Sequence, residues 1–258
     1  MSPRDALQRL IDGNARFVAG ESQFVGIDQI RRCDTFLGEQ PAALVLTCGD
    51  SRVAPEFVFD VGLGELFTLR NAGNVVTDSV LGSAEYAVTY LDTPVLVVMG
   101  QTHCSAVAAV AYAGDDHEHA SMPRHFAGML EQIRPVVDAL GGPKPGDEEL
   151  LANAIEGNVY QSMSHLLTRS PEIRLAVEEG RTAVVGAVYD THLGQVTWLG
   201  RHPQESTLLQ TPVEAIPGAV AEGDGEEGQL EVATGAHPAE AEEDQVMVEI
   251  GTEPIGNH

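Results

Sequence analysis

Three unbroken apolar runs constrain the fold of this chain more than any other feature. Residues 42–47 and 95–99 each follow a proline, and residues 182–189 form a third run. A strand that is apolar at consecutive positions is buried on both faces, as in a parallel sheet that helices cover on each side. The runs therefore predict the interior strands of a parallel sheet.

Helical patterns alternate with these strands. Residues 3–17 are predicted as an amphipathic opening helix with Ser2 as its N-cap, and residues 78–91 as a helix after a short strand at 67–70. Two more helices are predicted over 126–140 and 148–167, the latter ended by Ser170 and Pro171, with 112–123 as a loop. The alternation predicts an α/β fold, with a mainly parallel central sheet flanked by helices.

Composition divides the chain into three parts. Residues 1–40 are predicted as an N-terminal helical arm, 41–205 as the α/β core, and 206–258 as an acidic C-terminal extension that is mostly mobile. Within the extension, residues 245–250 alternate in polarity like an edge strand.

The charge and the cysteine count exclude several kinds of partner. The formal net charge is −25, and Lys144 is the only lysine. Such a negative field repels nucleic acid and anionic membranes, so neither is an expected partner. It suits concentrated salt, but an arginine-biased genome with an acidic tail explains it equally. Three cysteines and the lack of a secretory or membrane-spanning run predict a cytoplasmic protein.

Two cysteines follow predicted strands directly. Cys48 follows the run at 42–47 in the segment Cys48-Gly49-Asp50-Ser51-Arg52, and Cys104 follows the run at 95–99 in Gln101-Thr102-His103-Cys104. Ligands of an open parallel sheet bind beyond the carboxyl ends of its strands, where two thiolates can meet one ion. The pair predicts a metal site, and zinc is the metal expected. Cys33 has no partner at ligand spacing and is interpreted as structural.

These motifs resemble those of the β-class carbonic anhydrases. The first box matches Cys48 to Arg52, the second matches Arg70-Asn71-Ala72-Gly73-Asn74, and Cys104 matches a later zinc cysteine. The resemblance covers roughly residues 4 to 200 and implies a zinc enzyme that hydrates carbon dioxide reversibly to bicarbonate. It also implies catalytic roles for Asp50 and Arg52, whose pairing opens the fourth zinc position. The family's homodimers and homotetramers imply that the opening helix packs across a partner subunit.

One position departs from the family pattern. The family's box places a zinc-binding histidine three residues before the cysteine, where this chain has Gln101. The expected completions of the Cys48/Cys104 site are, in order, Asp50, then Gln101 or a water, then His103. Three functions stay open: hydration of carbon dioxide, turnover of a related molecule such as carbonyl sulfide, and an inactive homologue that binds bicarbonate or a protein partner.

Overall fold

The computed structural model describes residues 1–114 and 122–212. Its sheet has five strands in the order β2-β1-β3-β4-β5. The strands β1 (Ala43–Cys48), β2 (Leu66–Asn71), β3 (Val95–Gln101) and β4 (Ala183–Tyr189) are parallel, and β5 (Val196–Gly200) runs antiparallel to β4. The predicted fold class, a mainly parallel sheet flanked by helices, is confirmed.

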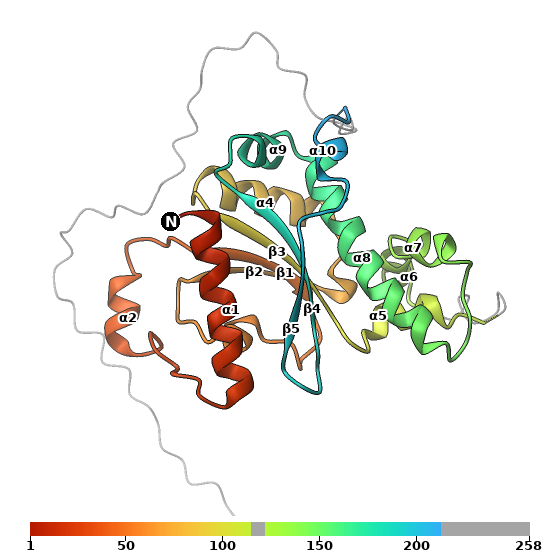
Figure 1. Cartoon of the computed structure of the whole chain (residues 1–258), viewed down its shortest axis with the longest axis horizontal. Helices are drawn as coiled ribbons and strands as arrows, with labels where there is room; N and C mark the ends of the chain where they lie inside the picture. Colours follow the sequence, from red (N-terminus) through yellow and green to blue (C-terminus); the bar gives the residue numbers. More distant parts are fainter. Residues whose placement is uncertain (115–121, 213–258) are drawn as a thin grey trace, which may run out of the picture.

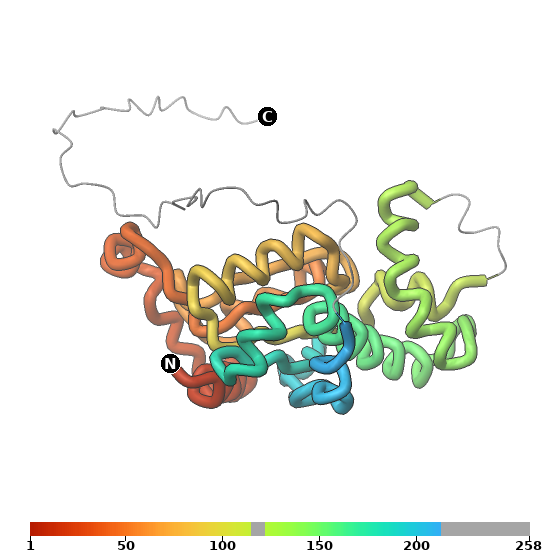
Figure 2. Tube along the Cα trace, turned by 90° about the horizontal axis from the view of Figure 1, so that it is seen from above, coloured from red at the N-terminus to blue at the C-terminus, as the bar shows by residue number. Residues whose placement is uncertain are grey.

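The two faces of the sheet form separate cores, because successive side chains of a strand point to opposite faces. Leu44 and Leu46 of β1 face the helices α4 (Asp78–Thr89), α8 (Glu148–Arg169) and α9 (Pro171–Glu178). Val45 faces α1 (Pro3–Ala19) and the short α3 (Pro55–Val58). Figure 2 shows α1 and α4 on opposite sides of the sheet.

The opening helix is built as its sequence predicts. The Ser2 side chain accepts a hydrogen bond from the backbone N–H of Asp5, Pro3 occupies the first turn, and Gly20 ends the helix with φ 70°. The face carrying Ala6 and Leu10 packs against the sheet of its own chain. The placement of this helix across a partner subunit, which the family resemblance implied, stays a prediction. The short helix α2 (Gln29–Asp34) follows α1 along the chain.

A third core lies beyond the carboxyl ends of the strands. It is formed by α5 (Ser105–Ala111), α6 (Arg124–Leu130), α7 (Arg134–Ala139) and the first half of α8, which Figure 1 shows gathered at one end of the molecule. The single helix predicted over 126–140 is wrong, because the chain turns between α6 and α7. Pro135 lies in the first turn of α7, where its missing N–H is tolerated.

The C-terminal part of the described chain stays on the core. After β5, the short α10 (Glu205–Leu208) places Leu208 and Leu209 against the core under α8, and Thr211 O accepts a hydrogen bond from Arg174 at 2.6 Å. The domain boundaries at 40 and 205 stay predictions. Most of the acidic extension, including the predicted strand at 245–250, lies outside the described residues.

Candidate metal centre

The carboxyl ends of β1, β2 and β3 bring the predicted site residues together. Cys48 is the last residue of β1 and lies in register with Asn71, the last residue of β2. Gln101 ends β3, and Cys104 follows three residues later as the N-cap of α5. Parallel strands end at the same edge of the sheet, so both thiols enter the third core there.

The spacing of the two thiols suits a single metal ion. Both side chains are buried, and their sulfur atoms lie 4.0 Å apart. Two sulfurs at about 2.3 Å from one tetrahedral zinc ion are separated by about 3.8 Å, whereas a disulfide brings them to about 2.05 Å. The thiol pair is therefore placed for metal binding without a large movement.

A hydrogen bond joins the two thiols. The Cys104 thiol donates to Cys48 Sγ, and this bond lowers the pKa of Cys48 to about 5, although burial acts in the opposite direction. The same bond, together with burial, raises the pKa of Cys104. A metal ion would displace the Cys104 proton, because thiolate is the form that binds metals.

A tight turn after β2 also contacts the Cys48 sulfur. The 3-10 turn η1 (Ala72–Asn74) directs the backbone N–H of Gly73 to Cys48 Sγ at 3.3 Å. The Asn71 side chain closes this turn, donating to Val75 O at 2.8 Å and accepting from Val75 N at 3.0 Å. The sequence marks this segment as a family box but does not indicate its contact with the sulfur.

Asp50 is turned toward Arg52. The guanidinium donates from Nε at 3.0 Å and from Nη2 at 2.7 Å, and the Arg52 backbone N–H donates at 2.9 Å. These bonds lower the pKa of Asp50 to about 2. In this arrangement the carboxylate is ionised and held by arginine, as in the open state that the family resemblance implied.

Arg70 holds the backbone of the loop that carries both groups. Its Nε donates to Cys48 O at 3.1 Å, and its Nη2 donates to Asp50 O at 2.7 Å. Arg70 therefore links the end of β2 to the loop after β1. The position of Arg70 inside the second family box was the only sequence signal for this role. Its hydrogen-bond acceptors are backbone atoms, which sequence patterns do not reveal.

Gln101 is the exceptional residue of the site. Its side chain is 0% exposed, and neither Oε1 nor Nε2 has a hydrogen-bond partner in the described part of the chain. The amide nevertheless lies near Cys48 and Asp50, since it contributes to lowering the pKa of each. A buried amide without partners is costly, so it calls for a ligand beside these side chains.

The remaining candidates are not part of this group. His103 is exposed, has φ 55°, and acts on the Asp190 carboxylate, whose pKa is lowered mainly by the backbone N–H groups of Leu193 and His192. Cys33 is an exposed free thiol on α2, so it does not pack in the core. Within residues 1–114 and 122–212, no three His, Cys, Asp or Glu side chains are grouped for metal binding. This follows from Gln101 standing at the histidine position and from Asp50 facing Arg52.

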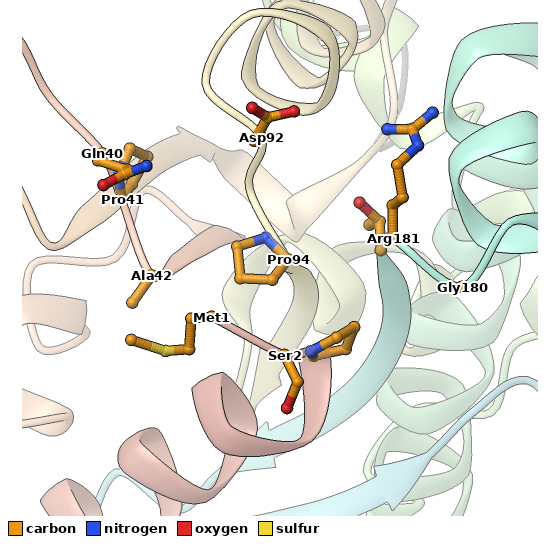
Figure 3. A pocket seen from close by; sticks show the side chains of 11 residues that line it. Met1, Ser2, Gln40, Pro41, Ala42, Asp92, Pro94, Gly180 and Arg181 are labelled. Carbon is orange, nitrogen blue, oxygen red and sulfur yellow. The ribbon is translucent and has the colours of Figure 1, made fainter.

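A hollow at the other edge of the sheet is separate from this chemistry. It has a volume of about 700 Å³ and is seen in Figure 3. Its walls come from segments that precede β1, β3 and β4, and among them are Pro41, Pro94 and Arg181. It therefore lies at the amino ends of strands whose carboxyl ends carry the thiols.

Comparisons with known proteins show the family of this chain. The family model described as Carbonic anhydrase matches residues 43–196. The carbonic anhydrase of Mycolicibacterium smegmatis is 39% identical over 196 residues, covering 76% of this chain and 92% of that protein. Carbonic anhydrase 2 of Mycobacterium tuberculosis is 36% identical over 195 residues, covering 75% and 91%.

Solved structures place the fold in one class of that family. The β-carbonic anhydrase of Coccomyxa superposes with a TM-score of 0.58 at 25% identity, covering 70% of this chain and 78% of the other. The β-carbonic anhydrase CcaA gives 0.58 at 26% identity, covering 74% and 94%. The chain belongs to the carbonic anhydrase family, and its fold is that of the β class.

Proposed function

We propose that this protein catalyses the reversible hydration of carbon dioxide to bicarbonate at a zinc ion held by Cys48, Cys104 and Gln101. The observation that carries the proposal is the pair of buried sulfurs 4.0 Å apart, beside an aspartate that arginine holds, in a chain of this family. Catalytic zinc sites in proteins use three protein ligands and leave a fourth position open. The unpartnered amide of Gln101 supplies the third ligand in our assignment.

Zinc, when bound, supplies a Lewis acid that lowers the pKa of a water molecule to about 7. The protein side chains prepare that position. Cys48 and Cys104 bind as thiolates, and the Gln101 oxygen adds a neutral donor. Arg52 holds the Asp50 carboxylate by two hydrogen bonds, so this carboxylate would stay off the metal and would be available to accept a hydrogen bond from the reacting water.

A second function, that of a catalytically inactive homologue, is favoured by one observation. The described residues offer two thiolates but no histidine at this site, and an amide oxygen is a weaker donor to zinc than an imidazole nitrogen. Such a homologue would keep the metal for stability and would bind bicarbonate or another protein. Residue 101 separates the two functions.

The test combines zinc content with stopped-flow hydration of carbon dioxide. We expect about one zinc ion per chain and measurable activity in the wild type, and loss of both in Cys48→Ala. Cys33→Ala is the matched control, because this thiol is exposed on α2 and is not a ligand in our assignment, and it should change neither quantity. Activity absent from the wild type and present in Gln101→His would refute the enzyme proposal and support the inactive homologue.

We further propose that the protein is a homodimer or homotetramer. Six large apolar side chains around α2 are exposed, and we call them the α2 apolar surface: Phe24, Val25, Ile27, Ile30, Phe36 and Leu37. A patch of this kind marks an interaction site, and β2 at the sheet edge is only partly covered. A tetrameric β-carbonic anhydrase of Sordaria macrospora shares the fold, with a TM-score of 0.56 at 24% identity.

Two points support a cytoplasmic location and a partner set without nucleic acid or membrane. The thiols of the metal site must stay reduced, which a reducing compartment ensures. The net charge of −25 opposes binding to anionic polymers and lipids. No helix among the described residues is long and apolar enough to span a membrane.

A further inference from the structure

We propose that Asn158 and Ser162 of α8 are positioning residues for the metal site, acting on Cys48 through the η1 turn. The inference rests on the proposed function, since it requires a metal at Cys48. Both residues lie outside the ligand set, and neither touches the two sulfurs in the described contacts. Their role is to hold the turn whose backbone N–H donates to the Cys48 sulfur.

Two buried hydrogen bonds connect α8 to the turn. Asn158 Nδ2 donates to Gly73 O at 2.7 Å, and Ser162 Oγ donates to Asn74 O at 2.9 Å. The two side chains are 1% and 2% exposed, and they are one helical turn apart on the same face of α8. Consecutive carbonyl groups of the turn are thus fixed by consecutive turns of one helix.

The turn needs this support because its backbone is unusual. Gly73 has φ 77° and Asn74 has φ 45°, both in the left-handed region. A non-glycine residue there costs of order 1 kcal/mol or more, and it persists only where surrounding contacts hold it. The carbonyl groups bound by α8 belong to these two residues, so the hydrogen bonds stabilise the strained part of the turn itself.

The helix α8 is itself fixed to the sheet. Gly100 of β3 and Gly186 of β4 allow its close approach, because a Cβ on Gly100 would lie 3.0 Å from Val159 Cγ2 and one on Gly186 would lie 2.9 Å from Val159 Cγ1. Val159 is the neighbour of Asn158 in the helix. The position of the Gly73 N–H is therefore set through a rigid chain of contacts that runs from the sheet to α8, to η1 and to Cys48.

The hydrogen bond from the Gly73 N–H to Cys48 weakens the donation of charge from this thiolate to the metal. An N–H that donates to a metal-binding thiolate draws electron density from the sulfur, so the metal stays a stronger Lewis acid. Loss of the Asn158 contact would let the turn relax and weaken that bond. The Cys48 sulfur would become more electron-rich, and its position relative to Cys104 would be less well defined.

The test uses the full chain loaded with zinc or with cobalt(II). Asn158→Leu removes the donor at similar volume, Ser162→Ala removes only one hydroxyl, and Asn153→Leu is the matched control because Asn153 is exposed on the same helix. Zinc affinity is measured by competition with a chelator, and the thiolate-to-cobalt charge-transfer band is measured by absorption. We expect about tenfold weaker zinc binding and a band shifted to lower energy in Asn158→Leu, with smaller changes of the same sign in Ser162→Ala.

A merely structural role would lower thermal stability without moving the band of the folded, cobalt-loaded protein. The inference is overturned if Asn158→Leu binds zinc like the wild type and its band is unchanged. If Asn158→Leu does not fold, Ser162→Ala decides, and an unshifted band in that variant overturns the inference. A wild type that binds no metal would refute the proposed function as well, whereas a metal-binding wild type with unaltered variants refutes the inference alone.

Discussion

Replacing Gly73 with alanine tests the local geometry of the site most directly. An alanine at φ 77° costs about 1 kcal/mol. The new Cβ would also lie 2.8 Å from Ile133 Cδ1 and 3.2 Å from Ala106 Cβ, and overpacking of this kind costs about 1 to 3 kcal/mol. We therefore expect the free energy of unfolding to fall by about 3 kcal/mol, because Ile133 can rotate away but Ala106 cannot.

Thermal unfolding followed by circular dichroism measures this effect. In a chain of this size, each kcal/mol changes Tm by about 2 to 4 °C, so Tm should fall by roughly 10 °C. Gly82→Ala is the control, because Gly82 is an exposed residue of α4 with no atom within 4 Å of an added Cβ. That change should raise stability by about 0.5 kcal/mol or more. A Gly73→Ala protein as stable as the wild type would refute the assigned conformation of the turn.

Three other predictions follow from contacts away from the thiols. Asp60 is fully buried, and its pKa is lowered because hydrogen bonds from Arg16 and backbone N–H groups outweigh the effect of burial. Its lowered pKa contributes stability that is present above about pH 4 and lost at lower pH. Asp60→Asn should therefore destabilise the protein at pH 7. The difference in the free energy of urea unfolding between wild type and variant should shrink below pH 4. A difference that grows in acid would contradict this sign. Asn14 is buried and bonds Val58 O, Gly194 O and Val196 N; Asn14→Leu should cost about 2 to 4 kcal/mol in urea unfolding, because these groups lose their partner. If the urea midpoint of Asn14→Leu equals that of the wild type, water must take over the hydrogen bonds of the amide. Phe36 is 77% exposed on the α2 apolar surface; Phe36→Glu should lower the sedimentation coefficient without lowering Tm by more than a few degrees, and an unchanged assembly would exclude this surface from the subunit interface.

Much of the fold could be predicted from residue pattern. The runs at 42–47, 95–99 and 182–189 became β1, β3 and β4, because short runs of consecutive apolar residues are typical of strands covered on both faces. The opening helix was predicted from its N-cap residue and its apolar face, which are local signals. β5 and α9 were missed: β5 is short and partly exposed, and α9 begins directly after Ser170, which caps it.

The site was predicted less completely than the fold. Sequence alone placed Cys48 and Cys104 at strand ends and identified Gln101 as the departure from the family pattern. It did not show which partner Asp50 would face, or that the turn at Gly73 contacts the sulfur. These features depend on hydrogen bonds between residues far apart in the chain, such as Asn158 and Gly73, which are separated by 85 positions.

The sequence by itself determined the class of sheet, the edge at which the thiols lie and the chemistry of the metal they suit, because hydrophobic period and residue type act locally. Only the tertiary structure decided that the two sulfurs lie 4.0 Å apart, that Arg52 holds Asp50, and that the Gln101 amide is buried without a partner. Those outcomes depend on the packing of β1 against β3 and of α8 against both β3 and β4. Packing of this kind joins distant segments, so no local pattern in the sequence specifies it.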